Sequence, residues 1–212
     1  VAYGDTAIIN TIETLNKADI KFCGIGKNKK EAESPAIVNY NGIKFGFLSY
    51  TSVFWPNINM EAGIETPGVS TISAKTYYEP HKRTLEMPGV PPIVKTEPDL
   101  KQLNCMKKNV KKLKNNVDIV IVSCHWGVSH KEEITNYQQK IGRTAIEAGA
   151  DIVFGHHPHV IQPIELWKGR PIFYSLGNFA FDWKKMRNKG KKGVMLKCDI
   201  KQKKLSGITI YP

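Results

Sequence analysis

The sequence has no closely spaced cysteine pairs. No CxxC motif occurs, which excludes a zinc knuckle of the usual spacing, and four cysteines among 212 residues are too few for a dense disulfide framework. We expect free thiols, with a single disulfide bridge as the alternative. The four residues are Cys23, Cys105, Cys124 and Cys198.

Long apolar runs are also absent. No stretch approaches the ~20 apolar residues that a membrane-spanning helix requires. Residues 1–15 lack the basic start and apolar core of a secretory leader. The chain has no internal repeat or low-complexity tract. With 212 residues and 41% hydrophobic content, residues 1–212 are predicted to form one α/β domain.

Acidic residues are scarce, since 19 Asp and Glu stand against 31 Lys and Arg and give a formal charge of +12. This excess favours an anionic partner, such as a phosphate, a nucleic acid, an anionic membrane surface or a polyacid. Solvated surface lysines are the equally weighted alternative. The basic run at residues 184–192 has no interleaved aromatic residues for base stacking, so we expect no sequence-specific nucleic-acid binding.

The amino-terminal part predicts a helix, a strand and a hairpin. Apolar residues recur at helical spacing between Thr6 and Ala18, and Ile20 to Cys23 is typical of a short strand. Residues 36–40 and 43–50 flank Asn41-Gly42, which favours a tight β-hairpin turn.

The next segment, about residues 52–100, contains most of the prolines and has no sustained periodicity. We predict an irregular insertion, either a functional cover or a disordered loop. It is followed by a helix whose apolar face faces the core and whose lysines lie mostly opposite. That apolar face comprises Leu103, Met106, Val110 and Leu113.

Residues 117–154 predict a strand, a helix and a second strand. The apolar run 117–124 leads directly into His125, and Asp151 to Phe154 forms the next strand. Between them, Thr135 or Asn136 can cap a helix that ends at Gly149. The strands should be parallel with a right-handed crossover, so their carboxyl ends meet at the edge where α/β sheets bind ligands.

The carboxyl-terminal part predicts three more strands. Residues 171–176 form a strand entering Gly177-Asn178-Phe179, and residues 193–200 pair antiparallel with residues 206–211.

Histidines gather behind the two parallel strands, at His125 and in Gly155-His156-His157-Pro158-His159. Neutral imidazoles suit Zn, Fe and Mn. Pro158 fixes one backbone dihedral angle, so that His157 and His159 can project to the same side of an extended loop. The alternatives are a loop of partly exposed histidines and, for His125, a core or strand-end role.

A divalent ion at this edge would lower the pKa of bound water to about 7 and polarise a phosphoryl or acyl oxygen, which predicts hydrolysis. His156 is the candidate catalytic residue, since it could protonate the leaving group, although a structural hydrogen bond is equally weighted. Trp126 and Trp55 either line the substrate pocket or fill the core.

Other side chains could reach the same edge. Asn178 is a candidate substrate-binding residue and Asp182 a further candidate, with a turn amide and a solvated carboxylate as the alternatives. Glu132 and Glu133 are a second source of carboxylates, which an acidic pair at a helix start also explains.

Together, these motifs resemble the bacterial capsule-synthesis family associated with poly-gamma-glutamate capsules, whose domain is related to calcineurin-like metallophosphoesterases. The resemblance covers nearly the whole chain outside residues 52–100. The matching segments are Tyr3-Gly4 with the following helix, Gly24-Ile-Gly-Lys-Asn28, Val122-Ser-Cys-His-Trp-Gly127, Gly155-His-His-Pro-His-Val160 and Tyr174-Ser-Leu-Gly-Asn-Phe179.

The resemblance implies a two-sheet sandwich flanked by helices, with His125, His157 and His159 as ligands of a divalent metal ion such as Mn, Zn or Fe. The family's first strand, with an acidic ligand, and its Asn-His segment would precede Val1, and Ala2 stands where an Asp is usual. We therefore expect an N-terminally incomplete domain, from either a longer gene product or a degenerate member.

The implied function is assembly or processing of capsule polymer through a metal-dependent hydrolase-like site. The alternatives are a noncatalytic accessory protein, which binds an anionic polymer or a membrane-bound capsule synthase, and a general phosphoesterase acting on small phosphoesters. The resemblance also implies a cell-envelope location outside the cytoplasm, with a membrane anchor upstream of Val1. A cytoplasmic location is the alternative.

Overall fold

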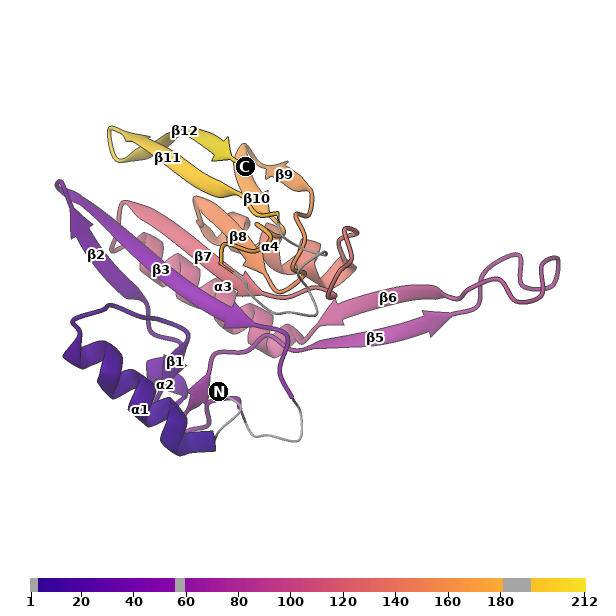
Figure 1. Cartoon of the computed structure of the whole chain (residues 1–212), viewed down its shortest axis with the longest axis horizontal. Helices are drawn as coiled ribbons and strands as arrows, with labels where there is room; N and C mark the ends of the chain where they lie inside the picture. Colours follow the sequence, from indigo (N-terminus) through magenta and orange to yellow (C-terminus); the bar gives the residue numbers. More distant parts are fainter. Residues whose placement is uncertain (1–3, 56–59, 181–191) are drawn as a thin grey trace.

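A six-stranded sheet forms the centre of the computed structural model, which describes residues 4–55, 60–180 and 192–212. Its strands are β2 (Ala36–Tyr40), β3 (Ile43–Thr51), β7 (Ile119–His125), β8 (Ile152–His156), β9 (Ile164–Trp167) and β10 (Arg170–Phe173). They lie in the order β2-β3-β7-β8-β10-β9 (Figure 1). The four inner strands are parallel, whereas β2 and β9 run antiparallel to their neighbours.

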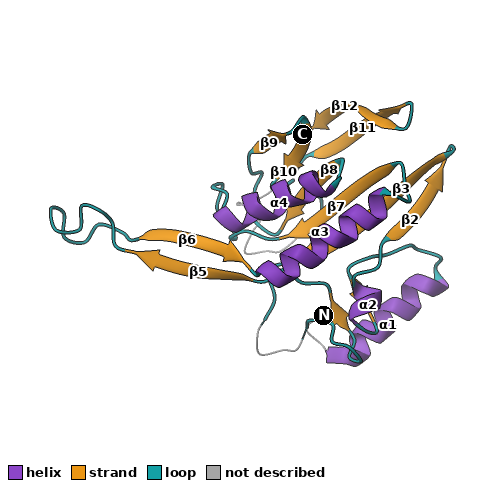
Figure 2. Ribbon diagram, turned by 180° about the vertical axis from the view of Figure 1, so that it is seen from behind, coloured by secondary structure: helices purple, strands orange, loops and turns teal. Residues whose placement is uncertain are grey.

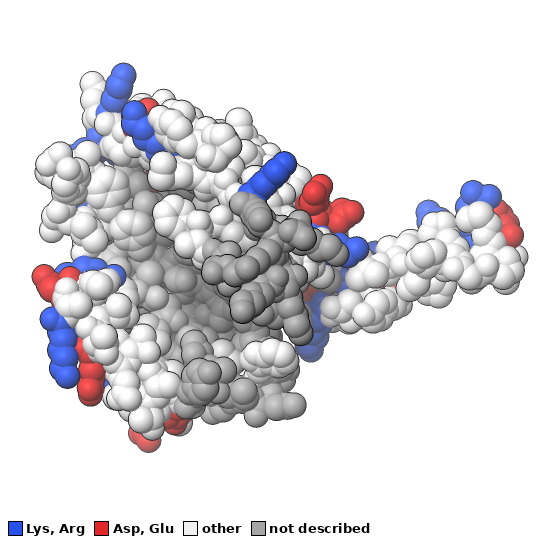
Figure 3. Space-filling view, viewed as in Figure 1, with Lys and Arg blue, Asp and Glu red and all other residues white. Residues whose placement is uncertain are grey.

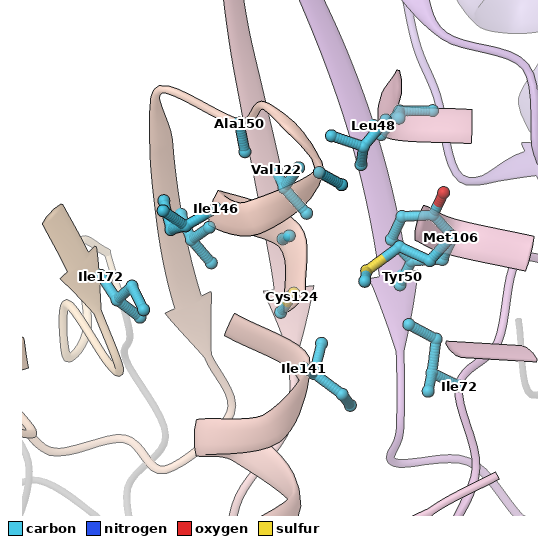
Figure 4. Close-up of a cluster of buried hydrophobic side chains, with 14 of the residues drawn as sticks. Leu48, Tyr50, Ile72, Met106, Val122, Cys124, Ile141, Ile146, Ala150 and Ile172 are labelled. Carbon is cyan, nitrogen blue, oxygen red and sulfur yellow. The ribbon is translucent and has the colours of Figure 1, made fainter. Parts of the chain in front are cut away.

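Two helices, α3 (Leu100–Lys114) and α4 (Asn136–Ala148), cover one face of this sheet (Figure 2). Alternate residues of β7 point toward them, and Val120 and Val122 are completely buried there with Met106 of α3. Figure 4 shows Val122 and Met106 among the buried side chains between the strands and helices. No helix within the described ranges is long and apolar enough to cross a membrane.

The opposite face of the sheet carries a second, smaller sheet. Its strands are β11 (Met195–Lys201) and β12 (Lys204–Tyr211), which pair antiparallel. A cavity of about 370 Å³ separates this pair from the six-stranded sheet, with Phe47, Ile121 and Phe154 among its lining residues. The prediction of an α/β fold with facing sheets and flanking helices is confirmed.

Smaller elements lie below the sheet in the view of Figure 1. They are α1 (Gly4–Lys17), β1 (Ile25–Gly26), α2 (Lys29–Ala32) and β4 (Gly68–Val69), and β1 pairs antiparallel with β4. The helix predicted from Thr6 to Ala18 is confirmed. The strand predicted from Ile20 to Cys23 is wrong: Ile20 is 53% exposed, and the strand begins only at Ile25.

A two-stranded ribbon, which we call the arm, projects from the body of the molecule (Figure 1). It consists of β5 (Ala74–Glu79), β6 (Ile93–Pro98) and the connection between them. The prediction of an irregular insertion over residues 52–100 is therefore wrong for this part. The prolines did not prevent pairing because Pro80, Pro88 and the following pair lie in the connection and Pro98 ends β6.

Turn and capping residues explain why the remaining predicted elements are confirmed. Asn41 and Gly42 take positive φ angles of 48° and 75° between β2 and β3, as a tight hairpin requires. Gly149, at φ 116°, ends α4 after Thr135 caps its start. All four cysteines are free, as expected. The short strand β9 was not predicted, because its four residues carry little periodicity.

One buried carboxylate joins the two central strands. Asp151 accepts hydrogen bonds from the Val120 backbone N–H (2.8 Å) and from Lys114 Nζ (2.7 Å). Its own N–H donates to the Val120 carbonyl (2.8 Å). The start of β8 is thus held beside the start of β7, and this contact helps set the register of the pair.

Replacing Asp151 should therefore destabilise the fold. Asp151→Ala leaves the buried Val120 N–H without its acceptor, which costs about 1–3 kcal/mol of unfolding free energy. Lys114 is partly exposed and can turn to solvent, so its lost ion pair adds little. Urea denaturation measures the change. Glu13→Ala on the exposed side of α1 is the control, expected within about 0.5 kcal/mol of the parent. Equal stability of the two variants would contradict this role.

Candidate functional site

His125 and His156 end neighbouring parallel strands. His125 is the last residue of β7 and His156 the last of β8, and the two are register partners. Residues directly paired in a ladder point to the same face, so both imidazoles project toward the side that carries β11 and β12. The prediction that the two histidine segments meet at the carboxyl edge of the parallel strands is confirmed.

The loop after β8 turns sharply. His157 (φ 97°) and His159 (φ 60°) both have left-handed backbones around Pro158. This conformation costs non-glycine residues about 1–3 kcal/mol each and concentrates at functional sites. The prediction that these histidines lie on an extended loop is therefore wrong. The loop is fixed from outside, because His130 N–H donates to the Pro158 carbonyl (2.8 Å).

Four imidazoles come together at this edge and form the histidine cluster: His125, His130, His157 and His159. The ring centres of His125 and His157 are 4.9 Å apart, and those of His157 and His159 are 6.0 Å apart. His130 stacks on His159 at 5.8 Å. The sequence analysis missed His130, since it stands alone after the Trp-Gly motif and no spacing pattern distinguishes it.

Two imidazoles of the cluster, His125 and His157, have lowered pKa values that favour the neutral form. Burial, followed by the proximity of His157, His156 and His159, lowers the pKa of His125 to about 4. Burial also lowers the pKa of His157 below its usual value, with smaller contributions from His159 and His130. Neutral imidazole is the form that donates a lone pair to a metal.

Two polar side chains orient the rings. Asn178 Oδ1 lies 2.8 Å from His159 Nδ1, and Asn178 Nδ2 donates to the His159 carbonyl (3.3 Å). Because an amide oxygen only accepts, His159 Nδ1 carries the proton, and the lone pair of the neutral ring lies on Nε2. Ser129 Oγ contacts His157 Nε2 at 3.2 Å. Asn178, predicted to bind substrate, thus contacts a histidine.

His156 lies beside the cluster, in an apolar setting. It lines the cavity between the sheets and packs edge-on against Phe154, with ring centres 5.3 Å apart. Burial lowers its pKa below the usual value. The geometry places it next to His125, and its catalytic role stays a prediction.

Trp126 takes the second of the two roles that the sequence left open, since it fills the core. It is completely buried, and its Nε1 donates to the Tyr174 carbonyl (2.7 Å). Trp55, in contrast, is largely exposed. Glu132 and Glu133 are exposed in the loop before α4, and Asp182 and most of the basic run at 184–192 lie outside the described residues.

Buried amides brace the loops around the cluster. Gln138 of α4 accepts from the Thr135 N–H and donates to Gln162 Oε1 (2.9 Å each). Gln162 Nε2 in turn donates to the carbonyls of Lys131 (3.0 Å) and Glu133 (3.2 Å). The loop after β7 and the loop after β8 are thereby joined through α4.

The chemistry of the cluster suits a divalent ion, because neutral imidazoles are ligands of such ions. Within residues 4–55, 60–180 and 192–212, no group of three or more His, Cys, Asp or Glu side chains is arranged to hold a metal. The described residues thus bring imidazoles together without forming a complete set of ligands.

Comparison with known proteins gives the family. The sequence model of a protein family, described as bacterial capsule synthesis protein PGA_cap, matches residues 1–183 of this chain. The chain belongs to this capsule synthesis family. It is 34% identical to the capsule biosynthesis protein CapA of Bacillus anthracis over 182 residues, which are 85% of this chain and 37% of that protein.

Other members and one solved structure are also similar. The PGA biosynthesis protein CapA of Bacillus subtilis is 30% identical over 88% of this chain and 42% of its own length. The chain thus spans about two fifths of these curated relatives. A structure provisionally assigned as a 5′-nucleotidase from Staphylococcus aureus covers 94% of this chain and 34% of its own, with 15% identity and a TM-score of 0.47.

Gly155, in the family motif before the histidines, is required by close packing. A Cβ there would collide with Trp126 Nε1 and the Tyr174 carbonyl, which are hydrogen-bonded to each other. Gly155→Ala should therefore lower the unfolding free energy by about 1–3 kcal/mol. In the control Gly207→Ala, the new Cβ would meet no atom closer than 3.5 Å. Thermal melting compares the variants, and equal melting temperatures would refute the packing role.

Proposed function

We propose that this capsule synthesis family member acts in assembly or processing of capsule polymer through a divalent-metal centre to which His125, His157 and His159 contribute ligands. The main observation in support of this proposal is the distance of 4.9 Å between the ring centres of His125 and His157. Two imidazoles that share one zinc through ~2.0 Å bonds have ring centres about 5 Å apart. This separation supports a shared ion.

The state of the rings supports the same proposal. Depressed pKa values keep His125 and His157 neutral near pH 7. Asn178 fixes the tautomer of His159, as outer-shell partners of metal-bound histidines do. His157 Nε2 faces Ser129, so this ring would bind through Nδ1 or Ser129 would turn away. The set of ligands requires donors beyond this cluster, and imidazole donors alone accept Mn, Zn or Fe.

The proposed chemistry is hydrolysis or transfer at a phosphoester or another bond of a polymer precursor. A bound divalent ion supplies polarisation of the reacting oxygen and activation of water. His156, next to His125 on the same face, would exchange a proton with the leaving group. The cavity beside His156 is lined mainly by apolar side chains, including Phe154 and Leu176.

Metal titration tests the proposal. Chelator-treated protein should bind Mn²⁺ or Zn²⁺ saturably in calorimetry. Because two ligands are lost, the variant His157→Ala with His159→Ala should bind at least about tenfold more weakly. His81→Ala is the control, since His81 lies in the connection of the arm. Equal affinities for parent, double variant and control would overturn the proposed centre.

A second function, noncatalytic binding of an anionic polymer, is favoured by a different observation. A cavity of about 630 Å³ between α2, β2 and α3 is lined by Lys29, Lys30 and Lys112. Its one acidic group, Glu33, is engaged by Lys29 (3.7 Å) and by the Cys105 thiol (3.2 Å). Leu48 contributes to an apolar floor. Such a cavity suits a chain with carboxylates and aliphatic segments.

Binding of poly-glutamate in the presence of chelator tests this role. Replacing Lys29, Lys30 and Lys112 together by Gln should weaken binding about tenfold, because the cavity loses its cations. The control replaces three exposed lysines of the β11–β12 pair by Gln, which changes the net charge equally. Those lysines are Lys197, Lys201 and Lys204. Equal weakening by both variants would indicate nonspecific attraction, and binding abolished by chelator would assign recognition to the metal centre.

A further inference from the structure

The arm exposes large apolar side chains on both of its strands. Tyr78 is 70% exposed and its cross-strand neighbour Val94 is 54% exposed. The face of the arm visible in Figure 3 is largely uncharged between the body and the charged tip. An isolated two-stranded ribbon is marginally stable in water, so additional strands or a covering element would stabilise it.

The two edges of the arm differ. Along β6, Pro98 has no N–H, and the Thr96 N–H donates to Asn136 Oδ1 at the start of α4 (3.2 Å). The β6 edge is therefore partly blocked. Among the described strands, β5 pairs with β6 alone, so its other edge presents backbone groups that can pair with a further strand.

The Thr96 hydrogen bond also shows which groups of β5 point outward. The Thr96 N–H points away from β5. Thr96 and its partner Thr76 are therefore a non-hydrogen-bonded pair of the antiparallel ladder. Antiparallel pairs alternate between the two types. Tyr78 and Val94, two residues further along, are consequently of the same type. The N–H and C=O groups of Thr76 and Tyr78 thus face away from β6.

The sequence of β5 is complementary to itself. When two copies pair antiparallel around Tyr77, Thr76 of each faces Tyr78 of the other, so these outward groups satisfy one another. In the same register, Lys75 lies opposite Glu79 of the second copy. The opposite charges meet twice, once on each side of the symmetry axis. Glu79, which already binds Lys95 (2.6 Å), would then lie between two lysines.

We infer that the chain dimerises through its arm, with β5 of two copies pairing antiparallel around Tyr77 to form a four-stranded sheet. Closed two-fold pairing leaves the blocked β6 strands at the outer edges. A second copy is the partner that fits this edge, because Lys75 then lies opposite Glu79 and the outward backbone groups of Thr76 lie opposite those of Tyr78. The inference is independent of the proposed metal centre, which lies on the body of the molecule.

Proline substitutions on the two edges of the arm test whether the dimer forms through β5 rather than through another surface. Tyr78→Pro removes an outward N–H of β5, whereas Val94→Pro removes an outward N–H of β6 and is the matched control. Neither N–H belongs to the ladder between β5 and β6. Sedimentation of the intact chain up to about 100 μM should show a dimer, with a dissociation constant raised at least about tenfold by Tyr78→Pro and within about twofold of the parent in Val94→Pro.

Cross-linking gives a second readout that does not depend on the proline variants folding. Residues at position 77 of the two copies would face each other at a Cα separation of about 4.5 Å, within the range for a disulfide. Under oxidation, Tyr77→Cys should yield a covalent dimer, and Lys95→Cys, opposite it on β6, should yield far less. A monomer at every concentration, or equal cross-linking of both variants, would overturn the inference.

Discussion

The register between β7 and β8 is the constraint on which the candidate site depends. Asp151 joins the starts of these strands through the Val120 backbone, and five residues later both strands end on a histidine. A shift of one residue would turn one of these imidazoles to the helix face, where completely buried aliphatic side chains leave no room. A single pairing in the core thus determines which functional groups become neighbours at the edge.

Much of the fold could be predicted from the sequence because its signals were local and strong. The run before His125 predicted β7, Asn41-Gly42 predicted the hairpin, and Gly149 predicted the end of α4. The arm was not predicted, because prolines were taken to prevent pairing although they lie in its connection. Proline excludes a ladder only where its own position needs an N–H.

The candidate site was predictable in part. The family motifs indicated His125, His157 and His159, and the structure brings these three together with His130. The contacts that orient them were not predictable. Asn178 and Ser129 act through tertiary distances that no spacing in the sequence reveals. For Trp126 the sequence left a pocket wall and a core position open, and only its burial and its hydrogen bond to the Tyr174 carbonyl decide for the core.

The buried amides around the histidines have one more consequence. Gln138 and Gln162 hold the two loops through hydrogen bonds among protein atoms, and the His130 N–H binds the Pro158 carbonyl between the left-handed residues of the second loop. The loop is therefore preorganised: its conformational entropy is given up during folding rather than during ligand capture. In small zinc domains, by contrast, the ion itself drives folding. Here the position of the histidine loop depends on hydrogen bonds of the protein itself, so loss of one imidazole side chain leaves these hydrogen bonds in place.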